Sequence, residues 1–198
     1  MSFSTRNSTF LKSRSTVLGL GLLFVICLGL YCLRIHQAPY KVEVRNLDRS
    51  NTIVDVSNIG KATLFEIETG EPVKFVPESE YHLLIFFSPS DCPSCLDEFR
   101  VWQSLSNRYQ RSGLQVVGIL INTSLDESRS FMKSLKPSFS LYLDNGKEIE
   151  RTMGLPHDTP FKVVTGPDGK VVLADGPNFD PSKQKAFGER VIAIMQSS

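Results

Sequence analysis

The feature that most constrains the fold is the alternation of strand-like and helix-like segments in the second half of the chain. Two continuous apolar runs, LLIFF at 83–87 and LQVVGILIN at 114–122, have the length of strands buried on both faces. Each precedes a segment, 96–110 or 125–136, whose apolar residues recur at steps of three and four, as on one helix face. This alternation predicts a largely parallel central sheet connected by crossover helices.

Two predicted hairpins add antiparallel strands. Short alternating runs at 65–68 and 73–76 surround the turn sequence Thr-Gly-Glu-Pro, and the segment 161–176 holds two β-branched runs around Gly-Pro-Asp-Gly. The remaining predicted elements are a strand at 139–144 and helices at 147–155 and 182–196. The sequence therefore predicts an α/β fold, with a central mixed sheet flanked by helices and an N-terminal β-hairpin extension.

An uncharged apolar run, 17–33, follows a basic N-terminal segment that contains no acidic residue. The run is at the short end of what spans a bilayer, and no small-residue cleavage site follows it. An uncleaved anchor is therefore favoured over a cleaved signal peptide. The two cysteines inside the run, Cys27 and Cys32, are expected to be inert.

The predicted organisation is a basic cytoplasmic head at 1–16, a transmembrane anchor at 17–33, a linker with one or two short strands at 34–61 and a main domain at 62–198. Because the head carries basic residues and no acids, we expect it to stay in the cytoplasm. The main domain would then lie on the periplasmic or cell-surface side. The net charge of the chain is only +1, which argues against a nucleic-acid partner.

The sequence SPSDCPSC, 88–95, places two cysteines where an apolar strand gives way to a helix. If the helix begins there, Cys92 is its N-cap and Pro93 its first residue, and the helix dipole lowers the pKa of the Cys92 thiol. Cys95, one turn later, can resolve a mixed disulfide held on Cys92. A purely structural disulfide across so short a loop stabilises a fold little, and a zinc site would need a second Cys/His pair. The motif therefore predicts redox chemistry.

This combination of segments resembles the thioredoxin-fold proteins, in particular the membrane-anchored thiol–disulfide oxidoreductases of the TlpA/ResA type with their redoxin (AhpC/TSA-like) domain. The resemblance runs from about Thr63 to the C-terminus and rests on LLIFFSPSDCPSC, LQVVGIL and FSLYLDNGKEIERTMGLPHDTPFKVVTGPDGKVV. In that family a proline after threonine is cis and lies against the cysteines, which implies this role for Pro160. The backbone of Thr159 would then pair with an extended substrate segment.

The resemblance implies a complete set of site residues. The expected catalytic residues are Cys92 and Cys95, and the expected substrate-binding residues are Pro93, Ser94, Thr159 and Pro160. We expect no cofactor beyond the redox-active disulfide between the two cysteines, and no metal. The expected partners are a disulfide-containing protein substrate, an upstream membrane thiol donor and, through the anchor, the membrane.

Two positions depart from the pattern. Thioredoxins usually have tryptophan before the first cysteine, where this chain has Asp91, and a carboxylate there is expected to raise the pKa of the Cys92 thiol. Cytoplasmic thioredoxins have a buried acid six residues before that cysteine, where this chain has Phe86. Four residues could replace this acid, although each is expected to be a solvated surface residue: Glu80, Asp97, Glu98 and His157.

The leading hypothesis is thiol–disulfide exchange outside the cytoplasm, which reduces disulfides of exported proteins, for example in cytochrome c maturation. Two alternatives stay open. Peroxiredoxins share the fold, but their signature places Thr or Ser three residues before the reactive cysteine and Pro seven before it; Cys92 has Pro89 and Ile85 there. Copper-delivery proteins on this fold use two cysteines and a distal histidine, here His157, but their cysteines are usually three residues apart.

Overall fold

The computed structural model describes residues 42–45, 51–54, 56–75, 80–91, 96–155 and 158–197. Contacts divide the chain into two units, Met1–Pro39 and Tyr40–Ser198, and only the second contains described residues. The predicted head and anchor lie outside them. Within the described ranges, no helix is long and apolar enough to cross a membrane.

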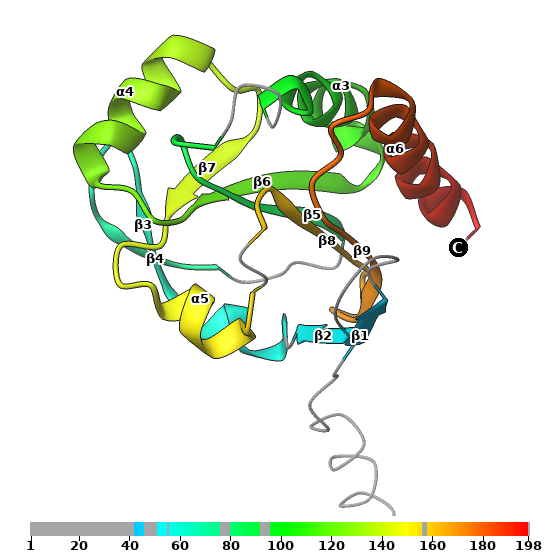
Figure 1. Ribbon diagram of the computed structural model, residues 1–198, viewed down its shortest axis with the longest axis horizontal. Helices are drawn as coiled ribbons and strands as arrows, with labels where there is room; N and C mark the ends of the chain where they lie inside the picture. The colour runs from blue at the N-terminus through cyan, green and yellow to red at the C-terminus, as the bar shows by residue number, and fades with distance from the viewer. Residues whose placement is uncertain are drawn as a thin grey trace, which may run out of the picture. The chain divides into compact units, whose positions relative to one another are not determined.

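One mixed sheet of seven strands forms the centre of the second unit (Figure 1). Its strands are β3 (Thr63–Glu66), β4 (Pro72–Lys74), β5 (Tyr81–Phe87), β6 (Leu114–Leu120), β7 (Ser140–Leu143), β8 (Phe161–Thr165) and β9 (Val171–Asp175). Their order across the sheet is β4-β3-β7-β6-β5-β8-β9. A separate antiparallel pair, β1 (Val42–Arg45) and β2 (Asn51–Val54), falls in the segment predicted to be a linker with short strands.

The central strands β5, β6 and β7 are parallel, as the alternation with helices predicted. The β3–β4 hairpin joins β7 antiparallel, and the β8–β9 hairpin joins β5 antiparallel on the opposite side. The predicted mixed sheet is confirmed. The expectation of a largely parallel sheet is wrong, because both hairpins extend the same sheet.

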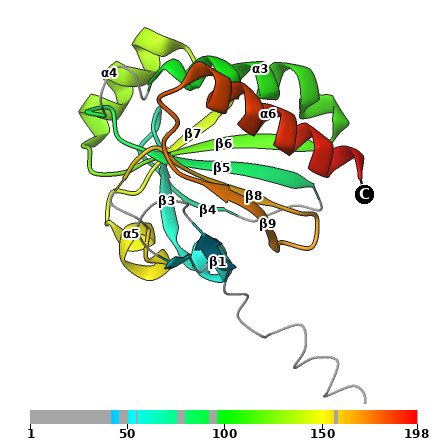
Figure 2. The ribbon, with the colours of Figure 1, turned by 45° about the vertical axis from the view of Figure 1, so that its right-hand side comes forward.

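Helices cover both faces of this sheet (Figure 2). On one face lie α3 (Phe99–Tyr109), α4 (Leu125–Leu135) and α6 (Pro181–Gln196), and on the other lie α5 (Glu148–Met153) and the 3₁₀ helix η1 (Val56–Lys61). A second 3₁₀ helix, η2 (Gln110–Ser112), follows α3. From β3 onward, the order of strands and α-helices is the predicted one.

Strand β5 shows how the sequence produces two core layers. Successive side chains of a strand point to opposite faces, so a strand between two helical layers must be apolar at every position. Phe86 packs in the cluster that contains Ile149 of α5, and Phe87 packs in the cluster that contains Trp102 of α3. All four side chains are buried. The predicted strand with two buried faces is therefore confirmed.

Candidate functional site

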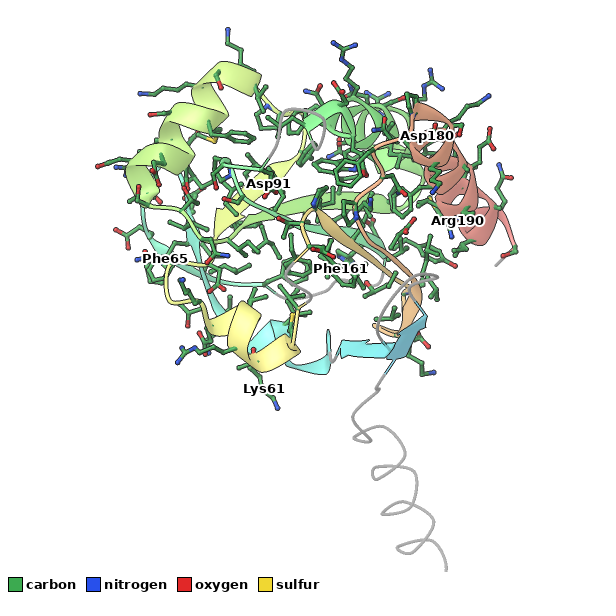
Figure 3. The ribbon with its side chains drawn as sticks, in the orientation of Figure 1. Lys61, Phe65, Asp91, Phe161, Asp180 and Arg190 are labelled. Carbon is green, nitrogen blue, oxygen red and sulfur yellow. The ribbon has the colours of Figure 1, made fainter. Side chains whose placement is uncertain are left out.

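The end of β5 and the start of β8 lie side by side at one edge of the sheet. The two strands are antiparallel, and Phe86 is paired with Phe161. The residues after β5 and the residues before β8 therefore emerge at the same edge. Figure 3 labels Asp91, which follows β5, and Phe161, at which β8 begins.

The residues after β5 form a closed turn. The Ser88 N–H donates to Asp91 Oδ2 at 2.9 Å, and the Asp91 N–H donates to the Ser88 carbonyl oxygen at 3.0 Å. The hydroxyls of Ser88 and Ser90 are 2.8 Å apart. These contacts fix the half-buried Asp91, the last residue before Cys92 in the sequence.

The loop before β8 is tied to this turn. The Thr159–Pro160 peptide bond is cis, as the resemblance implied. Pro160 is buried and Thr159 is half-buried. The Thr159 hydroxyl donates to Asp91 Oδ1 at 2.7 Å. The substrate-binding role of the two loop residues stays a prediction.

Several predicted site residues lie outside the described part of the chain. These are Cys92, Pro93, Ser94, Cys95 and His157. The catalytic roles of the cysteines, the predicted N-cap at Cys92 and the effect of Asp91 on the Cys92 thiol therefore stay predictions. Helical residues are described from Leu96 onward, with a turn at Glu98 before α3.

The expectation that Glu98 is a solvated surface residue is wrong. Its side chain is only 1% exposed, and its Oε2 lies 2.6 Å from Nζ of Lys162, which is also fully buried. Glu98 Oε1 accepts a short hydrogen bond from the Asn178 N–H. Glu98 is the N-cap residue of α3 but makes no side-chain cap, because its carboxylate bonds these two donors instead. Asp97 is exposed, as expected.

Sequence reasoning missed Lys162 and Asn178. Lys162 carried a signal: it is a charged residue inside FKVVT, a strand that is otherwise apolar except at its end. A lysine in such a strand needs a buried partner, because an unpaired ammonium in the core is very costly. Asn178 carried no signal, because it contacts Glu98 through its backbone.

Burial and pairing act in opposite directions on this ion pair. Burial raises the pKa of Glu98 above its ordinary value of 4.5, whereas the charge and hydrogen bond of Lys162 lower it. Burial lowers the pKa of Lys162 below 10.5, and Glu98 opposes that change. Two donors within bonding distance favour the ionised carboxylate, so we describe the pair as charged at neutral pH.

Further polar contacts connect the ion pair to β9 and α6. Asn178 Nδ2 donates to Asp175 Oδ2 at 3.3 Å, and Arg190 donates to the same oxygen at 2.5 Å. Gln184 Nε2 donates to the Asn178 carbonyl oxygen at 2.8 Å. Lys162 Nζ lies 5.1 Å from the ring centre of Phe187, which is within the range of a cation–π contact. The start of α3 is thereby connected to the start of α6.

No metal centre is visible in the part of the chain that the structure describes. Within it, no three histidine, cysteine or acidic side chains are grouped so that they could hold a metal ion. The copper hypothesis depends on Cys92, Cys95 and His157, which lie outside the described residues, and it stays untested.

The chain has a thioredoxin-like α/β fold with a central mixed sheet, and its cis-proline loop contacts the turn that precedes a Cys-x-x-Cys sequence. These features define the class of thioredoxin-fold redox proteins. The chain belongs to the AhpC/TSA family, whose family model matches residues 61–174, more than half of the sequence. It is thus a thioredoxin-like redox enzyme, and the predicted redoxin resemblance is confirmed.

Relatives of two kinds share this fold. Chloroplastic peroxiredoxin Q of Sedum lineare is 26% identical over 158 residues, which cover 75% of this chain and 84% of that protein. A protein described as thiol:disulfide interchange protein DsbE from Chlorobium tepidum superposes with a TM-score of 0.59 at 22% identity, over 67% of this chain and 92% of its own. Peroxiredoxin Q of Xanthomonas campestris superposes with a TM-score of 0.58 at 15% identity, over 71% and 93%. At these identities, the two structural matches show the fold alone.

Proposed function

We propose that the chain is an extracytoplasmic thiol–disulfide oxidoreductase that reduces disulfide bonds of exported proteins, for example of apocytochrome c. The observation that supports this most is the contact between Asp91 and Thr159. These residues directly precede the first cysteine and the cis-proline, the two parts of a site that must act on the same substrate disulfide.

A second contact supports the same assignment from the other side of the cysteine motif. Glu98 follows Cys95 by three residues, and Lys162 follows Pro160 by two. Their ion pair joins the residues that follow each of the two site segments. Both flanks of the Cys-Pro-Ser-Cys sequence are thus bonded to the flanks of the cis-proline.

In the proposed reaction, the Cys92 thiolate attacks one sulfur of a substrate disulfide. The substrate S–S bond breaks, a mixed disulfide forms on Cys92, and one substrate sulfur leaves as a thiolate. The Cys95 thiol then loses its proton and attacks the Cys92 sulfur, which releases the second substrate sulfur and closes the Cys92–Cys95 disulfide. The substrate gains two electrons from the enzyme, which is oxidised, and its two sulfurs take up two protons, one balanced by the proton lost from Cys95 and one from solvent. An upstream membrane thiol donor restores the dithiol by the same exchange.

Glu98 is our candidate for the proton acceptor that Phe86 cannot supply. Phe86 is fully buried at the position where cytoplasmic thioredoxins have an acid. Glu98 is a buried carboxyl whose pKa is raised by burial, as is common for groups that exchange protons in active sites. It is close in sequence to Cys95, the thiol that must ionise in the resolving step.

The trapping of a mixed disulfide tests this function. Cys95→Ser removes the resolving thiol, so adducts between Cys92 and substrate proteins should accumulate in cells and disappear on reduction. Cys92→Ser is the matched control, because it removes the attacking thiol and keeps the same motif. Equal amounts of adduct in both variants, or none in either, would contradict the proposed mechanism.

The proposed location is the outer side of a membrane, with the main domain anchored by residues 17–33. An alkaline phosphatase fusion after Ser198 should be active in a bacterial host, because this reporter folds only where disulfides form. An inactive fusion, together with activity of the same reporter exported on a known signal, would place the domain in the cytoplasm.

A peroxidase is the second candidate, and the relationship to peroxiredoxin Q of Sedum lineare favours it. In that reaction a cysteine thiolate attacks a peroxide oxygen, the alcohol leaves, and the sulfenic acid condenses with the second cysteine to a disulfide and water. The signature positions argue against it. Counted from Cys95 they hold Cys92 and Ser88, and counted from Cys92 they hold Pro89 and Ile85. Consumption of hydrogen peroxide by the reduced protein at rates above those of free dithiothreitol would favour this candidate.

A further inference from the structure

The carboxylate of Asp91 bonds two segments that are far apart in the sequence. Its Oδ2 accepts the Ser88 N–H at 2.9 Å, and its Oδ1 accepts the Thr159 hydroxyl at 2.7 Å. Asp91 and Thr159 are 68 positions apart in the chain. Each carboxylate oxygen therefore serves one segment, and a side chain with a single acceptor oxygen could not make both bonds in this geometry.

We propose that Asp91 is a positioning residue: it holds Thr159 so that the backbone of the cis-proline loop is aligned to receive an extended polypeptide substrate. This inference rests on the proposed function, because it assigns a specificity for polypeptide disulfides to the same site. Tryptophan, which thioredoxins usually have at this position, has no carboxylate and could not accept the Thr159 hydroxyl.

The bonding of Thr159 explains why its side chain matters to a backbone interaction. The hydroxyl is committed to a charged acceptor, which makes this hydrogen bond stronger than one between neutral groups. Among the described residues, the Thr159 backbone makes no hydrogen bond of its own. We infer that a substrate strand pairs with these peptide groups, while the side chain fixes their direction.

The proposal predicts a difference between two kinds of substrate. A polypeptide disulfide uses both the cysteines and the backbone of the Thr159 loop. A small aromatic disulfide such as 5,5′-dithiobis(2-nitrobenzoate) has no peptide backbone and needs the cysteines alone. Loss of the Asp91–Thr159 bond should therefore impair the reduction of insulin much more than that of the small disulfide.

The test uses the full-length protein with four variants. Thr159→Val removes the hydroxyl at almost constant volume, and Thr159→Ser keeps it. Asp91→Ala removes the bond from the other side. Thr123→Val is the matched control, because the Thr123 hydroxyl also donates to a carboxylate, that of Glu127 at 3.0 Å, in a different loop. Thermal unfolding of each variant shows whether it is folded.

With Thr159→Val and Asp91→Ala, we expect KM for insulin to rise about tenfold and kcat to change little, the size expected for one hydrogen bond to a charged group. Reduction of the small disulfide should fall by no more than about twofold, a difference within ordinary variation between variants. Thr159→Ser, which keeps the hydroxyl, should have the KM for insulin of the unmodified protein, and so should Thr123→Val.

Three outcomes would overturn the inference. Thr159→Val could match Thr159→Ser on insulin, or both disulfides could lose activity equally in a folded variant, or Thr123→Val could cause the same rise in KM. An unmodified protein that reduces neither disulfide would instead overturn the proposed function itself, and the inference with it. The two failures are thus distinguishable in one set of assays.

Discussion

Replacement of Lys162 by methionine is the perturbation for which the structure gives the largest expected effect on stability. Lys162 is fully buried and forms an ion pair with Glu98 at 2.6 Å. Methionine has a similar length and no charge, so the carboxylate would keep only the Asn178 N–H as a partner. The variant therefore leaves a buried charge without a counter-ion.

Removal of one partner from a buried ion pair costs about 3–5 kcal/mol of unfolding free energy. For domains of roughly 150–250 residues, each 1 kcal/mol lowers Tm by about 2–4 °C, so we expect Tm to fall by roughly 6–20 °C. Circular dichroism during thermal and urea unfolding of the full-length protein measures both quantities. The exposed pair Lys185–Glu189, at 3.7 Å, supplies the control, since Lys185→Met should cost less than about 1 kcal/mol.

A double variant separates loss of the charge pair from loss of packing. In Glu98→Gln/Lys162→Met no charge is left buried, and the glutamine oxygen can still accept the Asn178 N–H. We expect the double variant to be more stable than Lys162→Met by at least about 2 kcal/mol, because removing both charges of a buried pair is often nearly neutral. The reasoning would be refuted if the effects of the two single substitutions simply added within about 0.5 kcal/mol.

The pH dependence of this variant has a definite sign. Burial raises the folded-state pKa of Glu98 above 4.5, and the loss of Lys162 removes the largest opposing cause. The folded state then binds this proton more tightly than the unfolded state, so the contribution of Glu98 to stability is complete below about pH 4.5 and is lost as pH rises through its folded-state pKa. Urea midpoints across this range should fall more steeply in Lys162→Met than in the unmodified protein.

The remaining predictions concern packing and helix ends. Gly118→Ala should cost about 1–3 kcal/mol, because a Cβ there would lie 3.1 Å from the rings of Phe139 and Phe87 and clash with Leu141. Gly146→Ala, where a Cβ would meet nothing within 4 Å, should change stability by less than about 0.5 kcal/mol in the same urea titration. Ser124→Ala should cost about 1 kcal/mol, because it removes the capping box with Glu127 at the start of α4. Ser130→Ala, within the same helix, should cost less, since alanine is the better helix former there.

The elements of the fold could be predicted because each is encoded locally. Strand β5 reads as an apolar run because both of its faces are covered, and α3 shows its buried side as Phe99, Trp102 and Leu105. Turn sequences such as Gly-Pro-Asp-Gly mark the β8–β9 hairpin in the same local way. The joining of the β3–β4 hairpin to β7 could not be predicted, because strand pairing depends on contacts between distant segments.

The polar partners at the site were beyond prediction for a related reason. Glu98 is a charged residue that directly follows Asp97 and lies two positions before Arg100, so its residue type and these charged neighbours suggest a surface position. Its burial depends on Lys162, 64 positions away, and on a backbone N–H that leaves no trace in residue type. The cis bond before Pro160 was accessible only through the family resemblance, because its local sequence also suits a trans turn.

The two contacts that join the cysteine-flanking residues to the cis-proline loop should affect different properties. The Glu98–Lys162 pair is fully buried, so its loss leaves a charge in the core and acts on the free energy of unfolding. The Asp91–Thr159 bond is half-buried, and water can replace either partner when it is lost, so folding should be affected little. Loss of this bond should instead raise the KM for polypeptide disulfides. In a plot of unfolding free energy against KM for insulin, variants of the Glu98–Lys162 pair should therefore differ mainly in unfolding free energy. Variants of the Asp91–Thr159 bond should differ mainly in KM. A single line through both sets would mean that the site loses activity only because the domain loses stability.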